Sequence, residues 1–75
     1  MAKKTKKEAA NEWGGVDYRG KEGLARTATD DGVTTVMFLS GPGEIMQWKA
    51  AFGSATPAVV IQAAVTEARR LADGR

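Results

Sequence analysis

The sequence predicts a small α+β fold, in which an antiparallel β-meander of three to four strands packs against one C-terminal α-helix. Two observations lead to this prediction. Turn-forming residues recur about every ten positions between residues 20 and 54, which is the spacing of a β-meander. The chain then ends in an amphipathic segment, whose apolar side needs a second layer to cover it.

The helix is expected over residues 57–73. Thr56 is a suitable N-cap, Pro57 suits the first helical position, and Gly74 is a natural C-terminal stop. At about 100° per residue, one side of this helix is apolar. The residues on that side are Val60, Ile61, Ala64, Val65, Ala68, Leu71 and Ala72. We therefore expect this stripe to pack on the sheet.

Three strands are expected over residues 15–19, 24–29 and 33–39. The third is the strongest, because it is rich in β-branched and aromatic residues. Its end is apolar on both sides, which is typical of a central strand covered on both faces. Asp31 and Gly32 form a hairpin turn signal before it. Gly14 and Gly15 indicate a bulge or a close backbone approach near the first strand.

Residues 44–52 fit two structures. As a strand, they would place Met46, Trp48 and Phe52 on one face. As a helix, they would stack Ile45, Trp48 and Phe52 on one side, and their intrinsic propensities favour this alternative. The meander spacing and the short connection from the preceding strand favour a strand over residues 44–50, which is our prediction.

Residues 1–11 are polar and charged, and they predict a flexible basic arm before a single small domain over residues 12–75. Lys3, Lys4, Lys6 and Lys7 lie in this arm, whereas residues 8–75 hold seven Lys and Arg against nine Asp and Glu. The arm is either a hook for nucleic acid or an acidic partner, or a solubilising leader. The slightly acidic remainder differs from the basic body of most groove-reading proteins.

The composition excludes most catalytic chemistry. The chain has no Cys and no His, which removes disulfides, thiolate or imidazole metal sites and His-dependent nucleophilic triads. Residues 30–32 lack the spacing of a calcium loop, and residues 40–43 lack the Lys-Ser/Thr of a phosphate loop. Glu44 has no partner carboxylate in the sequence nearby. We therefore expect no enzyme, no cofactor, no metal and no small-molecule substrate.

The cellular setting is expected to be the cytoplasm, without a membrane partner. The longest apolar runs are much shorter than the roughly 18 residues of a membrane span. The basic start is not followed by the hydrophobic region of a secretory signal.

Two classes of function are consistent with these features. The first is a small accessory protein that acts through protein–protein interaction, as a homodimer or other homo-oligomer or as a subunit of a larger assembly. Val59 and Ala63 lie off the core stripe beside Val60, so these three residues are the candidate interface. The alternative is a nucleic-acid-binding regulator that uses the lysine arm and the sheet face, with Trp13 as a contact aromatic.

Overall fold

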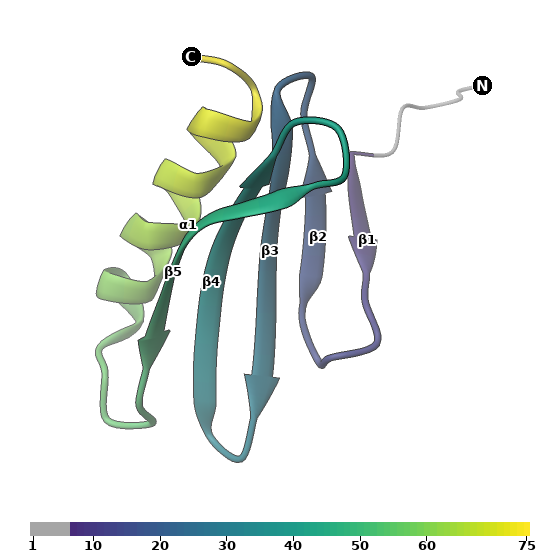
Figure 1. Ribbon diagram of the computed structural model, residues 1–75. Helices are drawn as coiled ribbons and strands as arrows, with labels where there is room; N and C mark the ends of the chain where they lie inside the picture. The colour runs from purple at the N-terminus through teal and green to yellow at the C-terminus, as the bar shows by residue number, and fades with distance from the viewer. Residues whose placement is uncertain (1–6) are drawn as a thin grey trace, which may run out of the picture.

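Residues 7–75 form two layers, a five-stranded antiparallel sheet and one helix across one of its faces (Figure 1). The structure is a computed structural model that describes these residues. The elements are β1 (Glu8–Ala10), β2 (Val16–Arg19), β3 (Gly23–Asp30), β4 (Val33–Ser40), β5 (Ile45–Phe52) and α1 (Ala58–Ala72). The predicted α+β meander with a C-terminal helix is therefore confirmed, with five strands in its sheet.

The strands follow one another across the sheet in the order β1-β2-β3-β4-β5. Short turns make this meander possible. Between β3 and β4, Asp30 pairs with Val33, so that only Asp31 and Gly32 form the loop. Both have positive φ, 55° and 79°, as a type I′ hairpin turn requires. The segment 44–52 is a strand, as the meander spacing predicted, and the helical alternative is wrong.

The first strand lies where the sequence predicted part of a flexible arm. Glu8–Ala10 pairs with β2, and the N–H of Arg19 donates to the carbonyl oxygen of Lys7 at 2.8 Å. The expectation of an unstructured segment up to residue 11 is therefore wrong for residues 8–10. The error arises because these residues have no strand propensity of their own and pair through backbone groups. Residues 1–6 lie outside the described part of the chain.

The ends of α1 differ from each other in how they are capped. Pro57 is the N-cap, and no side chain bonds the free N–H groups there, so the predicted capping role of Thr56 is wrong. At the other end, the N–H of Gly74 donates to Leu71 and that of Arg75 to Arg70. Gly74 has φ of 80°. This is a Schellman motif, and it confirms Gly74 as the stop.

The layer between α1 and the sheet is built from small side chains. Ala68 and Ala72 of α1 are fully buried against Val36 of β4 and Ala25 of β3. Alanine has no side chain beyond Cβ, so the helix backbone lies close to the sheet. The half-buried residues around this centre are Tyr18, Phe38, Trp48, Phe52, Ile61, Ala64 and Val65. Of the predicted stripe, Leu71 is only half-buried and Val60 is exposed.

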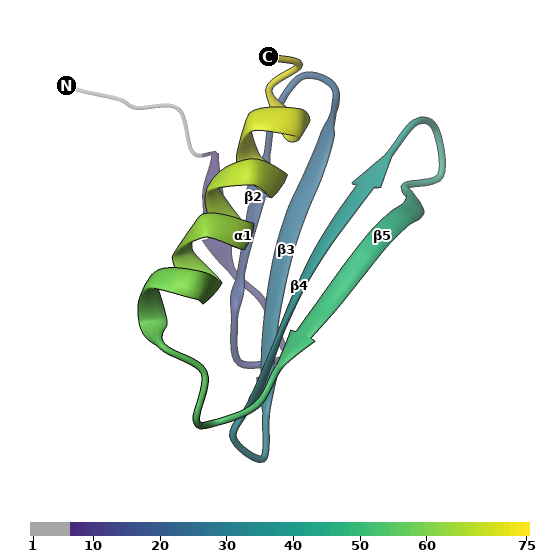
Figure 2. The ribbon, with the colours of Figure 1, turned by 90° about the vertical axis from the view of Figure 1, so that its left-hand side faces the viewer.

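The face of the sheet opposite α1 is covered at one end by the β4–β5 hairpin. In Figures 1 and 2 the start of β5 arches over this face, away from the helix. A register shift at Phe38/Leu39 produces the bend, so that Trp48 pairs with Phe38 but Met46 pairs with Leu39. Met46 therefore lies on the opposite face from Trp48, contrary to the predicted alternation. Beneath the hairpin, Leu24 is fully buried and Leu39 nearly so.

Candidate interaction surfaces

The outer edge of β5 is the longest free edge of the sheet. β5 has eight residues and lies last in the strand order, so only one of its edges is paired among residues 7–75. In Figure 2 the β5 side of the sheet faces the viewer, and β5 diverges from α1 toward its start. Ile45 is 64% exposed and Met46 45% exposed at its start. Unpaired backbone groups with apolar neighbours are the features that let an edge strand pair with another chain.

The flank of α1 on the β5 side of the sheet carries further apolar residues, toward the end of β5 and away from Ile45 and Met46. The opposite flank lies over β1 and β2, because Arg69 contacts the Tyr18 ring and the Glu8 carboxylate. Val60 lies nine residues before Arg69, which is about 180° around the helix. Val60, Ala64 and Leu71 therefore lie on the β5 side. We call the outer edge of β5 together with this flank the β5 surface.

The three residues predicted as an interface are not equivalent. Val60 belongs to the β5 surface and is 44% exposed. Val59 is 73% exposed, and with Ala63 it lies on the side of α1 that points away from the sheet. The structure therefore places one predicted residue beside the free edge and the other two on a separate, outward helix surface.

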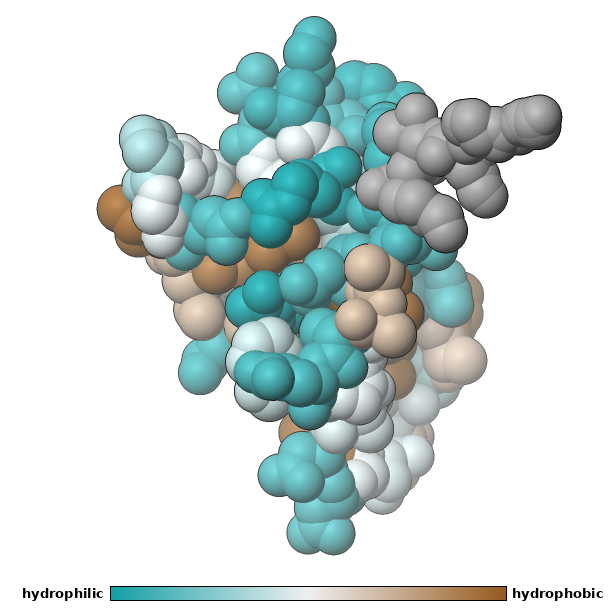
Figure 3. All heavy atoms as spheres, turned by 90° about the vertical axis from the view of Figure 1, so that its right-hand side faces the viewer, coloured by the Kyte–Doolittle hydropathy of each residue, from teal (hydrophilic) through white to brown (hydrophobic). Residues whose placement is uncertain are grey.

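The β1 edge is short and surrounded by charge. β1 has three residues, and the Glu8 carboxylate lies 2.5 Å from the Arg69 guanidinium. Viewed from this side, the molecule is mostly hydrophilic, and the strongly apolar surface lies mainly under the projecting β4–β5 hairpin (Figure 3). Short length and charged side chains are common ways to prevent an edge from pairing.

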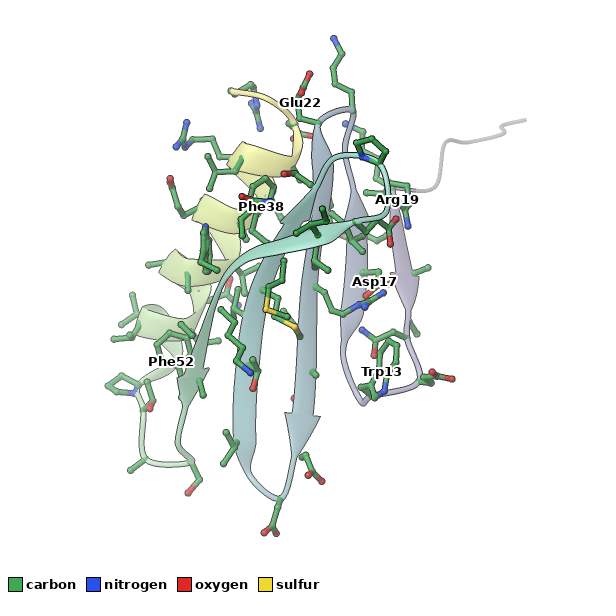
Figure 4. All side chains as sticks on the ribbon, in the orientation of Figure 1. Trp13, Asp17, Arg19, Glu22, Phe38 and Phe52 are labelled. Carbon is green, nitrogen blue, oxygen red and sulfur yellow. The ribbon has the colours of Figure 1, made fainter. Side chains whose placement is uncertain are left out.

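A polar cluster joins β2 and β3 on the face opposite α1 (Figure 4). The Arg26 guanidinium donates two hydrogen bonds, of 2.8 and 2.9 Å, to the Asp17 carboxylate. Asn11 donates a further bond of 2.9 Å to Asp17. The bonds from Arg26 and Asn11 hold the pKa of the Asp17 carboxyl below its usual value, against the opposing effect of burial. The cluster thus holds a carboxylate that is ionised and already bonded.

Trp13 covers this cluster. Its ring lies 4.6 Å from the Arg26 guanidinium, a cation–π geometry, and the side chain is 47% exposed. The N–H of Thr29 donates to the Trp13 carbonyl, and a Cβ at Gly15 would overlap the carbonyl oxygen of Thr27. The glycine pair therefore permits the close backbone approach that the sequence predicted. Trp13 remains an exposed aromatic beside a basic group.

A second charged cluster joins the start and the end of the described chain. Lys7 lies 3.4 Å from the Asp73 carboxylate, and the Tyr18 hydroxyl donates to Asp73 at 2.7 Å. The bond from Tyr18 is the main cause of a lowered Asp73 pKa. A shallow hollow beside this cluster is lined by four basic residues, Lys7, Arg19, Lys21 and Arg75.

The structure does not bring all the predicted nucleic-acid contacts together. Lys7 and Trp13 lie beyond opposite ends of β1, and Lys7 contacts the end of α1 whereas Trp13 contacts Arg26. Lys3, Lys4 and Lys6 lie outside the described residues. Sequence reasoning missed the Asp17–Arg26 pair. The sequence contains one signal for this pair. Asp17 and Arg26 carry opposite charges and lie equally far before and after the turn at residues 21–22, so they face each other across the hairpin.

Within residues 7–75, no group of three or more Asp and Glu side chains is placed to hold a metal ion. No helix in the same part of the chain is long and apolar enough to cross a membrane. Comparisons with protein-family models, with curated proteins and with solved structures find no match to this chain. The assignment of function therefore depends on the surfaces described above.

Proposed function

We propose that the protein is a small non-enzymatic interaction protein that binds another protein chain through the β5 surface. The observation that supports this most is the combination of a free eight-residue edge with exposed Ile45, Met46 and Val60. An unpaired edge supplies backbone hydrogen bonds to an incoming strand, and neighbouring apolar side chains supply burial.

The two carboxylates of the polar clusters, Asp17 and Asp73, are already engaged in side-chain hydrogen bonds. Asp17 and Asp73 have lowered pKa values because each accepts hydrogen bonds from neighbouring side chains. A general acid or base works best when its pKa lies near the operating pH, which is the opposite direction. The proposal includes a cytoplasmic location, which is compatible with the cysteine-free composition.

The test is capture of partners from an extract of the producing cells with tagged wild type, Val60→Asp and Val59→Asp. The two variants are a matched pair, since both place an aspartate on an exposed valine of the first helical turns. We expect nuclease-resistant protein partners, including untagged copies of the chain itself, to be lost with Val60→Asp and kept with Val59→Asp. Loss with Val59→Asp alone would contradict the β5 surface and favour the outward side of α1.

Nucleic-acid binding is a second candidate, and one observation favours it. A shallow hollow is lined by Lys7, Arg19, Lys21 and Arg75, and Lys7 is the last of the four lysines of the basic arm in the sequence. Three of these four cations already face carboxylates, since Lys7 and Arg75 pair with Asp73 and Arg19 pairs with Glu44. If this candidate is correct, binding of a single-stranded oligonucleotide should fall steeply with salt. Oligonucleotide binding should be weaker in Lys21→Ala and unchanged in Lys49→Ala. Absence of binding at low salt would exclude the candidate.

A further inference from the structure

We infer that the partner at the β5 surface is a second copy of this chain, paired strand to strand about a twofold axis that passes beside Ala50. This inference rests on the proposed function and names its partner. The pairing would extend the sheet of five strands into a continuous sheet through two antiparallel β5 strands.

Symmetry restricts how two copies can meet at this edge. A twofold axis perpendicular to the sheet places identical strands antiparallel and keeps both helices on the same face. Residues opposite each other in an antiparallel pair point to the same face. On β5, Trp48, Ala50 and Phe52 share the helix face, whereas Lys49 and Ala51 share the other. The axis must therefore pass beside a residue, not between two residues.

The charge on β5 selects among the remaining registers. Lys49 is the only charged residue of this strand. An axis beside Lys49 would place it opposite its own copy, which is destabilising. An axis beside Ala50 places Lys49 opposite the partner's Ala51. It also places Trp48 opposite the partner's Phe52, and aromatic pairs across strands are favourable.

The regular part of β5 fits the same register. Residues 48–52 pair without interruption with residues 34–38 of β4, and the register shift begins on the other side of Trp48. An axis beside Ala50 uses these regular residues in both copies. An axis beside Trp48 would place Ala50 opposite the partner's Met46, across the irregular part of the strand. The longest regular pairing is therefore centred on Ala50.

The flank of α1 adds the apolar area that a strand edge alone lacks. A stable interface buries roughly 800 Å² per partner. That is about one sixth of the 4871 Å² of accessible surface on this chain. Because α1 packs on the face that carries Trp48 and Phe52, its flank with Val60, Ala64 and Leu71 would face the partner's helix in the inferred pairing. The half-buried Trp48 and Phe52 and the exposed Val60 would then be buried in the same interface.

Single-cysteine variants test the register directly, because the chain has no cysteine of its own. Cα atoms directly opposite in an antiparallel pair are about 4.5–5.5 Å apart, which a disulfide spans. We expect Ala50→Cys to form a disulfide-linked dimer under mild oxidation at low micromolar concentration. Lys49→Cys and Ala63→Cys are the controls. The two copies of residue 49 would be offset diagonally by roughly 7–8 Å, and residue 63 lies on the outward side of α1.

A mixed experiment covers the case in which Ala50→Cys disturbs the strand. Lys49 and Ala51 are both exposed, so cysteine at either position should leave the fold intact. Oxidation of an equimolar mixture of Lys49→Cys and Ala51→Cys should give the mixed dimer in excess over either symmetric product. Light scattering on the wild type should report a dimer.

Two results would overturn the inference. A wild type that stays monomeric at high micromolar concentration would exclude the second copy, whatever the capture experiment gives. If Val60→Asp still abolished capture of another protein, the proposed function would stand without the homodimer. A dimer that crosslinks through Ala63→Cys, and through neither Ala50→Cys nor the mixture, would place the contact on the outward side of α1.

Discussion

The two edges of the sheet are held to the rest of the molecule by different forces. β1 is three residues long, and ion pairs hold it and the residues next to it: Lys7–Asp73, Glu8–Arg69 and Asp17–Arg26. β5 is eight residues long, and apart from the Arg19–Glu44 pair at its start it is held by apolar contacts, through Trp48 and Phe52 against the core and through the hairpin over Leu24. The short edge is closed by charge, whereas the long edge is left open with apolar surface beside it. The difference indicates which edge is available to a partner.

The largest expected effect concerns the apolar attachment of the β5 side. Leu24 is fully buried in a row with Leu39 and Met46 beneath the hairpin. Leu24→Ala should lower the free energy of unfolding by roughly 2–5 kcal/mol, measured by urea denaturation. Met46→Ala is the control in the same row, and it should cost much less because Met46 is 45% exposed. A loss for Leu24→Ala as small as the one expected for Met46→Ala would mean that the hairpin does not cover Leu24.

The second effect concerns the polar attachment of the β1 side. Asp17 accepts bonds from Arg26 and Asn11, so Asp17→Asn should cost about 1–2 kcal/mol at pH 7. The pKa of Asp17 is lowered in the folded state. Its stabilisation is therefore complete above the ordinary value of about 3.9 and is lost as the pH falls from there through the folded-state pKa.

Denaturation midpoints measured between pH 7 and pH 2 check the direction of this pH dependence. The difference between wild type and Asp17→Asn should shrink on acidification. A difference that stays constant down to pH 2 would show that the charge of Asp17 does not contribute. Leu24→Ala offers the comparison, because its cost comes from apolar burial and should not follow the Asp17 titration.

The smallest effect concerns the contact between β1 and the helix. Arg69 lies 4.7 Å from the Tyr18 ring and pairs with Glu8, and these groups are partly exposed. Arg69→Ala should therefore cost only about 0.5–1 kcal/mol. Hydrogen exchange should quicken in β1 and remain unchanged in β4. Arg70→Ala is the control, because Arg70 pairs with Glu67 on the helix itself. If hydrogen exchange in β1 were similar in Arg69→Ala and Arg70→Ala, Arg69 would not be the residue that holds β1 to the helix.

Most of the fold could be predicted because its signals are local. Asp31 and Gly32 specify a two-residue turn, residues 33–39 have strong strand preferences, and the alanines of α1 repeat at helical spacing. β1 could not be predicted in this way, since Glu8–Ala10 becomes a strand only by pairing with β2. The burial of Leu24 depends on a bend in β5, which no local pattern in residues 44–52 indicates.

The surfaces were predictable only in part, for a related reason. Val60 is recognisable from sequence as the edge of an apolar stripe, but the strand beside it depends on the sheet order. The exposure of Trp13 agrees with expectation, whereas its stacking on Arg26 requires the β2–β3 register. Sequence periodicity describes one element at a time. The candidate surfaces here are formed where two or three elements meet.

The meander connectivity also has a consequence for the order of folding. Every pair of neighbouring strands is joined by a short turn, so the sheet can grow by successive hairpin closures of low entropic cost. Such local topology favours rapid folding. The contacts between Lys7 and Asp73, and between Tyr18 and Asp73, span most of the chain. We expect these contacts to form last and open first, so that the two ends of the chain separate before the central hairpin of β3 and β4 loses its protection.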